Sequence, residues 1–444
     1  MSDLFTIGAS GTKAYRTAMA AISENIANSS TAGYARRTVT TAESGSSTAT
    51  MATYTSVGNF GGTYVSSVNR STDPYLDASV RSTATALGSA AARQRWLADS
   101  ETALNDTSTG VGQLMTTMYQ NIDKLAASPS DTSLRVTTLD SISRVAQSFN
   151  QTAADLENVS SGIATEAQSS VDTVNQALKS LADINNSLLR AQPGTSAYAQ
   201  LLDSRDAALD TISSNVNVTI SFGAHDSAEI SLGGQTLLSG TTATSLAVAA
   251  NEDGTLAFSL ADGTAIATPA SGTLGGLASA ASTVADRRSE LDDLAAQFVT
   301  NLNDWHAQGL TDGDVAGGAL LSGTTAATIS AVMTDPTQFA TKSSDGTLNG
   351  NLLTVTSVLR GSGSVENGWT ALIAGNAALL SSTKAEYETA TSRNDQAVAA
   401  REAVSGVDLD TEAADLLRVQ QAYSGCAKIL QVAKETMQSI LDIM

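Results

Sequence analysis

The sequence predicts a mainly α-helical protein with a small inserted β domain. Its long N- and C-terminal helices are expected to form an antiparallel coiled coil, with domains that are nested and discontinuous in sequence. Apolar residues near both ends recur at alternating steps of three and four residues, which is the a/d pattern of a coiled coil. The 5 prolines all lie between residues 74 and 336, so the segments 1–73 and 337–444 can form uninterrupted helices. Around residue 216 the apolar period changes to strict alternation, which predicts strands.

The two terminal stripes lack partners within their own segments. The C-terminal stripe consists of Leu416, Val419, Tyr423, Cys426, Leu430, Ala433, Met437, Ile440 and Met444. The N-terminal stripe consists of Leu4, Ile7, Gly11, Ala14, Ala18 and Ala21. A helix that cannot bury its apolar stripe alone needs another helix. We expect the partners to be the other end of the same chain and copies of it in neighbouring subunits.

The first quarter of the chain combines helix, turn and extended segments. A helix over residues 3–29 leads into a turn-rich stretch from Asn28 to Tyr34, in which Gly33 suits a left-handed backbone. Residues 35–70 are rich in Ser, Thr and Gly and are expected to be extended, with a hairpin around Gly61-Gly62. After Pro74, a helical pattern runs from about Leu76 to Leu125 with a break at Gly110–Gly112.

A second helical run covers residues 132–190, and a short helix over 197–213 follows Pro193-Gly194. The run over 132–190 carries an apolar stripe that comprises Val171, Val174, Leu178, Leu181, Asn185 and Leu188. Two interpretations of Asn185 stay open. Its amide faces the seam and fixes the register, or Ile184 faces the core and Asn185 faces water.

The β segment covers residues 215–275. Its first strand alternates through Val216, Val218, Ile220 and Phe222. Two hairpins follow, one turning at Gly233-Gly234 and the other at Asp262-Gly263. Helical spacing returns from Val284 to Trp305, and residues 309–370 are rich in Gly, Thr, Ser and Asp with short structured pieces.

The last part of the chain is helical again. A helix over about 369–404 leads to a kink at residues 405–408, and Glu412 and Asp415 lie in the first turns of the terminal helix, where they suit its dipole. The expected division is a terminal coiled-coil domain (1–70 with 405–444), a long-helix bundle (71–214 with 276–404) and the β domain (215–275).

Composition excludes several classes of partner and chemistry. The net charge of −20 makes binding to nucleic acid or to an anionic membrane unfavourable. No stretch of about 18 apolar residues occurs, so no transmembrane helix is predicted, and residues 4–26 are amphipathic, unlike a cleaved signal peptide. The single cysteine, Cys426, excludes an intrachain disulfide. It fits a small buried hydrophobe better than a reactive thiol, because Lys428 is its only basic neighbour.

The sequence predicts no catalytic residue, cofactor or metal site. The 2 histidines, His225 and His306, share no metal-ligand spacing with Cys426 or a carboxylate cluster. Residues 312–317 begin like a calcium loop, but Ala316 and Gly323 replace required ligands, so a solvated turn is predicted. The adjacent carboxylates of residues 290–293 are expected to form a solvated helix face.

Both ends carry recognisable motifs. The N-terminal ones are Met19-Ala20-Ala21-Ile22-Ser23-Glu24-Asn25-Ile26-Ala27-Asn28 and Thr31-Ala32-Gly33-Tyr34-Ala35-Arg36. The C-terminal ones are Ser405-Gly406-Val407-Asp408-Leu409-Asp410-Thr411-Glu412-Ala413-Ala414 and Gln420-Gln421-Ala422-Tyr423. They resemble the terminal signatures of bacterial flagellar rod, hook and hook-associated proteins, with Ala32 in place of a common proline. Within that superfamily, Gly33-Tyr34-Ala35-Arg36-Arg37, the segment 201–206 and the segment 303–309 resemble the hook-associated protein 1 family of hook–filament junction proteins.

The resemblance implies a structural protein without enzymatic activity. Such a protein is exported unfolded through the flagellar type III apparatus to the extracellular flagellum, polymerises at the distal end of the hook and joins it to the filament. The implied partners are copies of itself in a ring, the hook protein, the next junction protein towards the filament and an export chaperone, with neither nucleic acid nor membrane. The implied packing residues are Asn25, Ile26, Asn28, Thr31, Gly33 and Tyr34 at one end, and Leu416, Val419, Tyr423, Leu430, Met437 and Ile440 at the other. The alternatives are another axial protein (hook or distal rod) and a secreted helical adhesin or moonlighting enzyme whose termini form a bundle.

Overall fold

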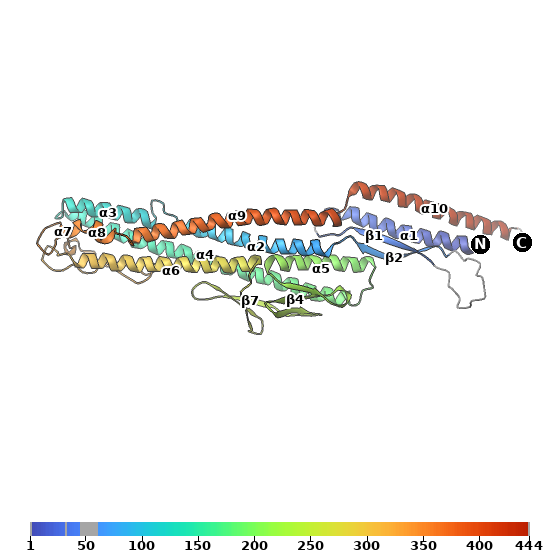
Figure 1. Ribbon diagram of the computed structural model, residues 1–444, viewed down its shortest axis with the longest axis horizontal. Helices are drawn as coiled ribbons and strands as arrows, with labels where there is room; N and C mark the ends of the chain where they lie inside the picture. The colour runs from blue at the N-terminus through green and yellow to red at the C-terminus, as the bar shows by residue number, and fades with distance from the viewer. Residues whose placement is uncertain (1, 32, 45–60, 443–444) are drawn as a thin grey trace. The chain divides into compact units, whose positions relative to one another are not determined.

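The computed structural model describes residues 2–31, 33–44 and 61–442. Contacts divide the chain into two compact units, each assembled from separate segments. Figure 1 labels the helices and strands named below. Unit 1 comprises residues 1–85, 173–245 and 391–444, and unit 2 comprises residues 86–172 and 246–390. The predicted three-part division stays a prediction, and the boundaries drawn by contacts fall at other positions.

Unit 1 holds both ends of the chain. Its complete elements are α1 (Ser2–Ala27), β1 (Arg37–Glu43), β2 (Thr63–Arg70), α5 (Ser196–Asn215), β3 (Thr219–Phe222), η1 (Ala224–Asp226), β4 (Ala228–Leu232), β5 (Gln235–Ser239), β6 (Thr242–Ala243) and α10 (Leu409–Leu441). Three long helices also contribute to it: the first part of α2 (Pro74–Ala103), the last part of α4 (Thr132–Leu188) and the end of α9 (Val365–Ser405).

Unit 2 contains the remaining parts of these three helices. Its own elements are α3 (Val111–Ala127), β7 (Leu246–Ala250), β8 (Leu256–Leu260), β9 (Ala265–Ile266), α6 (Gly272–Ala307), β10 (Leu321–Ser322), β11 (Ser330–Ala331), η2 (Pro336–Gln338), α7 (Gly350–Leu353) and α8 (Val355–Leu359). Together α2, α4, α6 and α9 form an antiparallel bundle in this unit. Two cross-links show that α2 and α9 run in opposite directions, because Thr83 contacts Asn394 and the later Arg93 contacts the earlier Glu386. The ion pairs Arg95–Glu166 and Arg288–Glu157 join α4 to α2 and α6.

Most helical predictions are confirmed to within a few residues, but α6 begins at Gly272, well before the predicted start at Val284 and inside the segment predicted as β. The helix over 3–29 is α1 and the run over 132–190 is α4. The predicted break is present but lies at residues 104–110, between α2 and α3, so Gly112 already belongs to α3. Gly33 has the left-handed φ of 77° that its place in the turn suggested. Asp408 ends the kink before α10, and its carboxylate accepts hydrogen bonds from the amides of Asp410 and Thr411.

The segment around residues 35–70 is a two-stranded antiparallel sheet. Strands β1 and β2 pair from Arg37 opposite Arg70 to Glu43 opposite Thr63. The backbone amide of Ser44 donates to the carbonyl of Gly62. The predicted hairpin is therefore confirmed, but Gly61-Gly62 is not its turn, because Gly62 still pairs with Ser44 beside the strands. Residues 45–60 lie outside the described residues.

The strands within residues 215–275 form two sheets. The first has the order β3-β4-β5-β6 and belongs to unit 1, whereas β7-β8-β9 belongs to unit 2. Both predicted hairpins are confirmed, and Gly233 and Gly234 supply the positive φ angles of 57° and 85° that the two-residue turn needs. The first strand begins later than expected, because α5 continues to Asn215 and the amide of Val216 still bonds the carbonyl of Ile212.

Of the two interpretations of Asn185, the structure supports the inward-facing amide. Asn185 is fully buried, and its amide bonds the backbone of Ala228 twice and the carbonyl of Gly240 once. The asparagine therefore ties α4 to a sheet and does not lie at a helix–helix seam.

The acidic and histidine side chains that the sequence offered as possible metal ligands make hydrogen bonds and ion pairs within the fold. Asp312 accepts two hydrogen bonds of 2.8 Å from Arg135, and Asp314 pairs with Lys342. His306 is buried, with Nδ1 2.7 Å from the carbonyl of Gly318 and Nε2 accepting from the amide of Ala340. Among residues 290–293, the prediction of a solvated face is wrong for Asp292, which accepts from the amide of Ala326 at 2.7 Å.

Two absences hold for the residues described. Within ranges 2–31, 33–44 and 61–442, no helix has the length and apolar character needed to cross a membrane. The same ranges contain no group of three or more His, Cys, Asp or Glu side chains placed to hold a metal ion.

Candidate functional site

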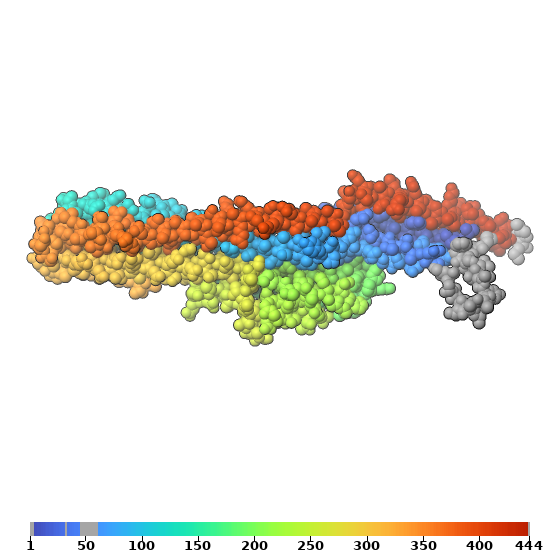
Figure 2. Space-filling view, viewed as in Figure 1, coloured from blue at the N-terminus to red at the C-terminus, as the bar shows by residue number. Residues whose placement is uncertain are grey.

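The two chain ends pack on each other as antiparallel helices. Near its start, α1 places Gly8 against Leu430 of α10, and Gly11 lies so close to Cys426 that an added Cβ would stand 2.6 Å from its Sγ. Figure 2 shows α10 lying along α1 with one side of α10 uncovered in this view. Small residues of α1 therefore admit the larger side chains of α10, and Cys426 is a packing residue of this seam.

Burial along the predicted stripes is uneven. Val419 and Ala433 are buried, and Leu416, Tyr423, Cys426 and Leu430 are partly buried against α1. Ile7 is partly buried on the other helix. At the open end of the pair, Leu4 is 47% exposed, Met437 58% and Ile440 45%. Met444 lies outside the described residues.

Asn25 is the centre of a buried polar junction between the two ends. It is fully buried on the last turns of α1. Its Nδ2 donates to the carbonyl of Arg37 at 2.9 Å and to Oε2 of Glu412 at 3.0 Å. Its Oδ1 accepts from the hydroxyl of Tyr34 at 2.8 Å and from the amide of Arg37 at 2.9 Å. All four hydrogen bonds that a primary amide can readily make are thus used.

Glu412 completes this junction from α10. Its side chain is only 1% exposed, and Oε1 accepts from Nε of Arg36 at 2.5 Å. The backbone amide of Arg36 also donates to the carbonyl of Ser405 at 2.9 Å. A carboxylate this buried needs a cation and hydrogen bonds, and Arg36 and Asn25 supply them. Glu412 therefore does more than complement the helix dipole.

The turn after α1 is built by the motif residues themselves. Asn28 donates to the carbonyl of Glu24 at 2.9 Å and accepts from the hydroxyl of Thr31 at 3.3 Å. Ile26 is partly buried. Burial raises the pKa of Tyr34 to about 12, so its phenol stays protonated and donates to Asn25. Ala32, the position of the family proline, lies outside the described residues.

An acidic row on α5 receives arginines from several segments of unit 1. Asp203, Asp206 and Asp210 follow a spacing of three and four residues, so they share one helix face. Asp203 binds both Arg37 at 3.0 Å and Arg70 at 2.7 Å, and Arg70 continues to Asp206 at 2.8 Å. Asp210 pairs with Arg401 of α9 at 2.8 Å. The row thus fastens the strands after α1 and the helix before α10 to the same element.

Sequence reasoning missed these charged partners. The sequence analysis included Asp203 and Asp206 only as part of the segment 201–206, which resembles the family. Arg36 and its partner Glu412 lie 376 residues apart in sequence. The available signal was the helical spacing of the three aspartates on a short helix. That spacing predicts a common face but names no partner.

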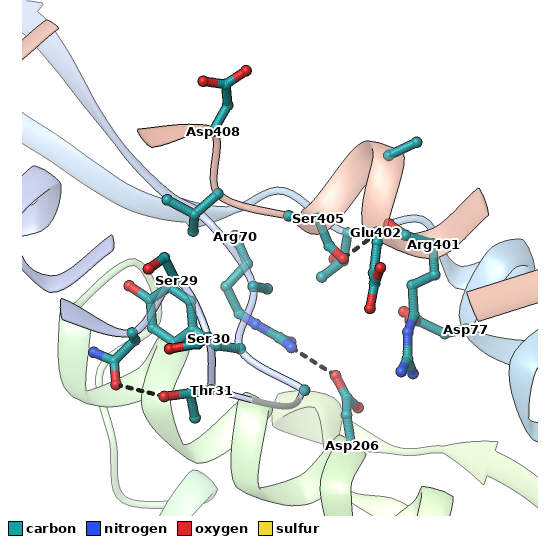
Figure 3. Close-up of a pocket in the computed structure, with 18 of the residues that line it drawn as sticks. Ser29, Ser30, Thr31, Arg70, Asp77, Asp206, Arg401, Glu402, Ser405 and Asp408 are labelled. Carbon is teal, nitrogen blue, oxygen red and sulfur yellow. Dashed lines mark hydrogen bonds and ion pairs between the residues drawn. The ribbon is translucent and has the colours of Figure 1, made fainter. Parts of the chain in front are cut away.

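A groove lies where these segments meet (Figure 3). It has a volume of about 990 Å³ and is lined by residues 28–31, 33–35, 401–403 and 405–410, with further residues from β2, α2, α5 and the segment between β2 and α2. Arg70 and Asp206 pair across it. Burial raises the pKa of Asp77, and the negative charge of Asp206 raises this pKa further. Its lining residues include paired ions and helix caps, with no histidine, cysteine or lysine.

Comparison with known proteins places the chain in a family. Residues 97–321, just over half of the chain, match the flagellar hook-associated protein FlgK helical domain. The chain belongs to the FlgK family. Residues 5–34 match the flagella basal body rod protein family, and residues 402–443 match the C-terminal family of the flagellar basal body rod FlgEFG proteins. The two terminal matches contain the α1–turn motif and α10, which together form the buried junction.

Relatives agree with this FlgK assignment. Flagellar hook-associated protein 1 of Bacillus subtilis is 24% identical over 97% of this chain and 96% of its own length. The Escherichia coli protein of the same name is 27% identical over 71% of this chain, and the match spans 59% of that protein. The flagellar hook junction protein FlgK from Burkholderia pseudomallei shares the fold, with a TM-score of 0.51 and 21% identity over 55% of this chain and 46% of that one.

Proposed function

We propose that this protein is a structural axial component of the bacterial flagellum that polymerises at the distal end of the hook and joins the hook to the filament. Membership of the FlgK family supports this role. The observation that carries it is the α1–α10 pair, whose ends leave apolar side chains uncovered. The exposed set at this end consists of Leu4, Phe5, Met437, Ile440 and Leu441.

Copies of the same chain are the partners that this surface fits best. Met437 and Ile440 continue the stripe that α1 covers at Leu430 and Ala433, but α1 has already reached its start. Fully burying one such side chain contributes about 1.5–3 kcal/mol, so a half-exposed pair leaves roughly 2 kcal/mol to be gained per subunit. A neighbouring subunit with the same seam can supply that burial repeatedly around a ring.

We also propose that this protein is exported through the flagellar type III apparatus and assembles outside the cell. The covered stripe of α1 consists mainly of small residues, Gly11, Ala14, Ala18 and Ala21, which bury little apolar area. A pair held by so little area is marginal in the free subunit and gains stability in the polymer. The hook protein, the next junction protein and an export chaperone are the other proposed partners, and we propose no catalysis.

The test introduces charges at two exposed residues of the uncovered seam and leaves the buried core of the subunit unchanged. In a strain that carries only the Met437→Asp/Ile440→Asp variant, we expect hooks without filaments and flagellin monomers in the medium. Both residues are exposed, so the free variant should melt like the parent. The matched control is Val404→Asp, an equally exposed apolar residue (46%) on α9, which should leave filaments normal.

Normal filaments in the double variant would refute the role of this seam. Immunogold labelling of isolated hook–basal bodies tests the location independently. Label confined to the distal end of the hook supports the junction role, whereas label along the whole hook or on the rod supports another axial protein. A variant absent from the medium would show an export defect, so secretion is measured first.

A further inference from the structure

The core of unit 2 is interrupted by a polar layer. The contiguous apolar core reaches Leu104 after α2, Leu156 on α4, Leu291 on α6 and Leu372 on α9, and it stops there. One helical turn further along α9 lies Asn376, which is 1% exposed. One turn back along α2 lies Ser100, which is fully buried. Beyond this level Leu97, Ile163 and Val284 are buried again, outside that core cluster.

The register of the helices places the two polar side chains at one level. Arg93 pairs with Glu386 at 2.7 Å, so the antiparallel helices α2 and α9 are level there. Two turns further along α2 is Ser100, and two turns back along α9 is Leu379, three residues from Asn376. At 1.5 Å per residue, that offset is about 4.5 Å along the axis.

The helix α6 contributes a third polar group at this level. A Cβ built on Gly375 would lie 3.9 Å from Nη2 of Arg287. The guanidinium of Arg287 pairs with Glu290. Its Nε is buried and has no hydrogen-bond partner.

None of these buried atoms is paired within the described part of the chain. Oγ of Ser100, Nε of Arg287 and both Nδ2 and Oδ1 of Asn376 lack a partner. Leaving a buried polar group unpaired costs about 1–3 kcal/mol, and four such atoms at one level would be unusually costly. Together they offer donors and acceptors in the number that a buried water molecule requires, which is about 2–4.

We propose that this polar layer is an internal hydration site, where at least one ordered water bridges Ser100 on α2 to Asn376 on α9. Water satisfies both the donors and the acceptors of the layer, which an ion of either sign cannot do. The site divides the bundle into two apolar cores, so the helices are held at this level by exchangeable hydrogen bonds to solvent instead of by interlocked apolar side chains.

Magnetic relaxation dispersion of water nuclei tests the proposal on the full chain, because it counts water molecules with long residence times. Asn376→Leu and Ser100→Ala should each lower the count by at least one.

The matched control is Thr383→Val. Thr383 is fully buried on the same helix two turns away, but its hydroxyl already donates to the carbonyl of Leu379 at 2.9 Å. This variant should leave the water count unchanged. An unchanged count in Ser100→Ala, which removes a single oxygen and preserves the fold, would overturn the proposal even if Asn376→Leu fails to fold. A drop of the same size in Thr383→Val would overturn it as well.

Discussion

Replacing Asn25 with alanine is expected to separate the two chain ends in the free subunit. The substitution removes four hydrogen bonds and leaves Glu412, the hydroxyl of Tyr34 and two backbone groups of Arg37 without this partner. One buried group left unpaired costs about 1–3 kcal/mol, and the losses are not additive. Because Tyr34 is partly exposed and Glu412 keeps Arg36, we expect a total loss of about 3 kcal/mol.

Hydrogen exchange of the α1 and α10 amides measures this loss directly. A loss of about 3 kcal/mol corresponds to exchange that is faster on the order of 100-fold, since about 1.4 kcal/mol is a factor of ten. The matched control is Asn28→Ala, three residues further in the same motif. Its amide makes two peripheral hydrogen bonds, so it should change exchange less than about tenfold. Equal effects of the two substitutions would refute the central role of Asn25.

The nearly isosteric Asn25→Asp separates chemistry from packing. The new carboxylate oxygen would stand where Nδ2 now lies, 3.0 Å from Oε2 of Glu412, so two negative charges would face each other. Protonation restores the donor, and the pKa of the new carboxyl is raised by its neighbour. After correction for intrinsic exchange, protection in this variant should therefore rise as the pH falls from 7 towards 5. Protection that falls with pH in this variant would contradict the geometry.

Two further predictions concern other parts of the chain. Burial lowers the pKa of His306 below its ordinary 6.5, so the folded state holds it neutral, with Nε2 accepting from Ala340. Its contribution to stability is complete above pH 6.5 and falls as the pH drops below that value, by at most about 1.4 kcal/mol per pH unit. Denaturant unfolding at pH 7 and 5.5 should show this extra loss in the parent but not in His306→Gln, and an equal loss in both would refute it. In unit 1, Gly11→Ala should destabilise the α1–α10 pair by about 1–3 kcal/mol, because the new Cβ would stand 2.6 Å from Sγ of Cys426. Thermal melting should show rescue by the added change Cys426→Ala, and no rescue would locate the strain elsewhere.

Apolar periodicity located the helices because it reports directly on which face of a helix is buried. The stripes of α1 and α10 were found with their correct faces, and so was the kink at residues 405–408. Periodicity reports nothing on where the covering helix ends. Met437 and Ile440 fit the stripe as well as Leu430 does, yet they are exposed because α1 begins opposite them.

The polar junction was harder to predict because its partners are far apart in sequence. Asn25 was named as a packing residue through a motif, while Glu412 was assigned only to the helix dipole. Their hydrogen bond joins residues 387 positions apart. Likewise, no local pattern shows that Asp203 forms ion pairs with both Arg37 and Arg70.

By itself, the sequence determined the helical class, the two hairpin turns at Gly233-Gly234 and Asp262-Gly263, the unpaired terminal stripes and the resemblance to flagellar axial proteins, because each depends on local spacing or a contiguous motif. Only the tertiary structure decided which buried polar groups meet, which stripe residues stay uncovered and that residues 215–275 divide between two units. These outcomes depend on where distant segments come to lie level with one another. Helix lengths and connections set that alignment across hundreds of residues, and no local period records it.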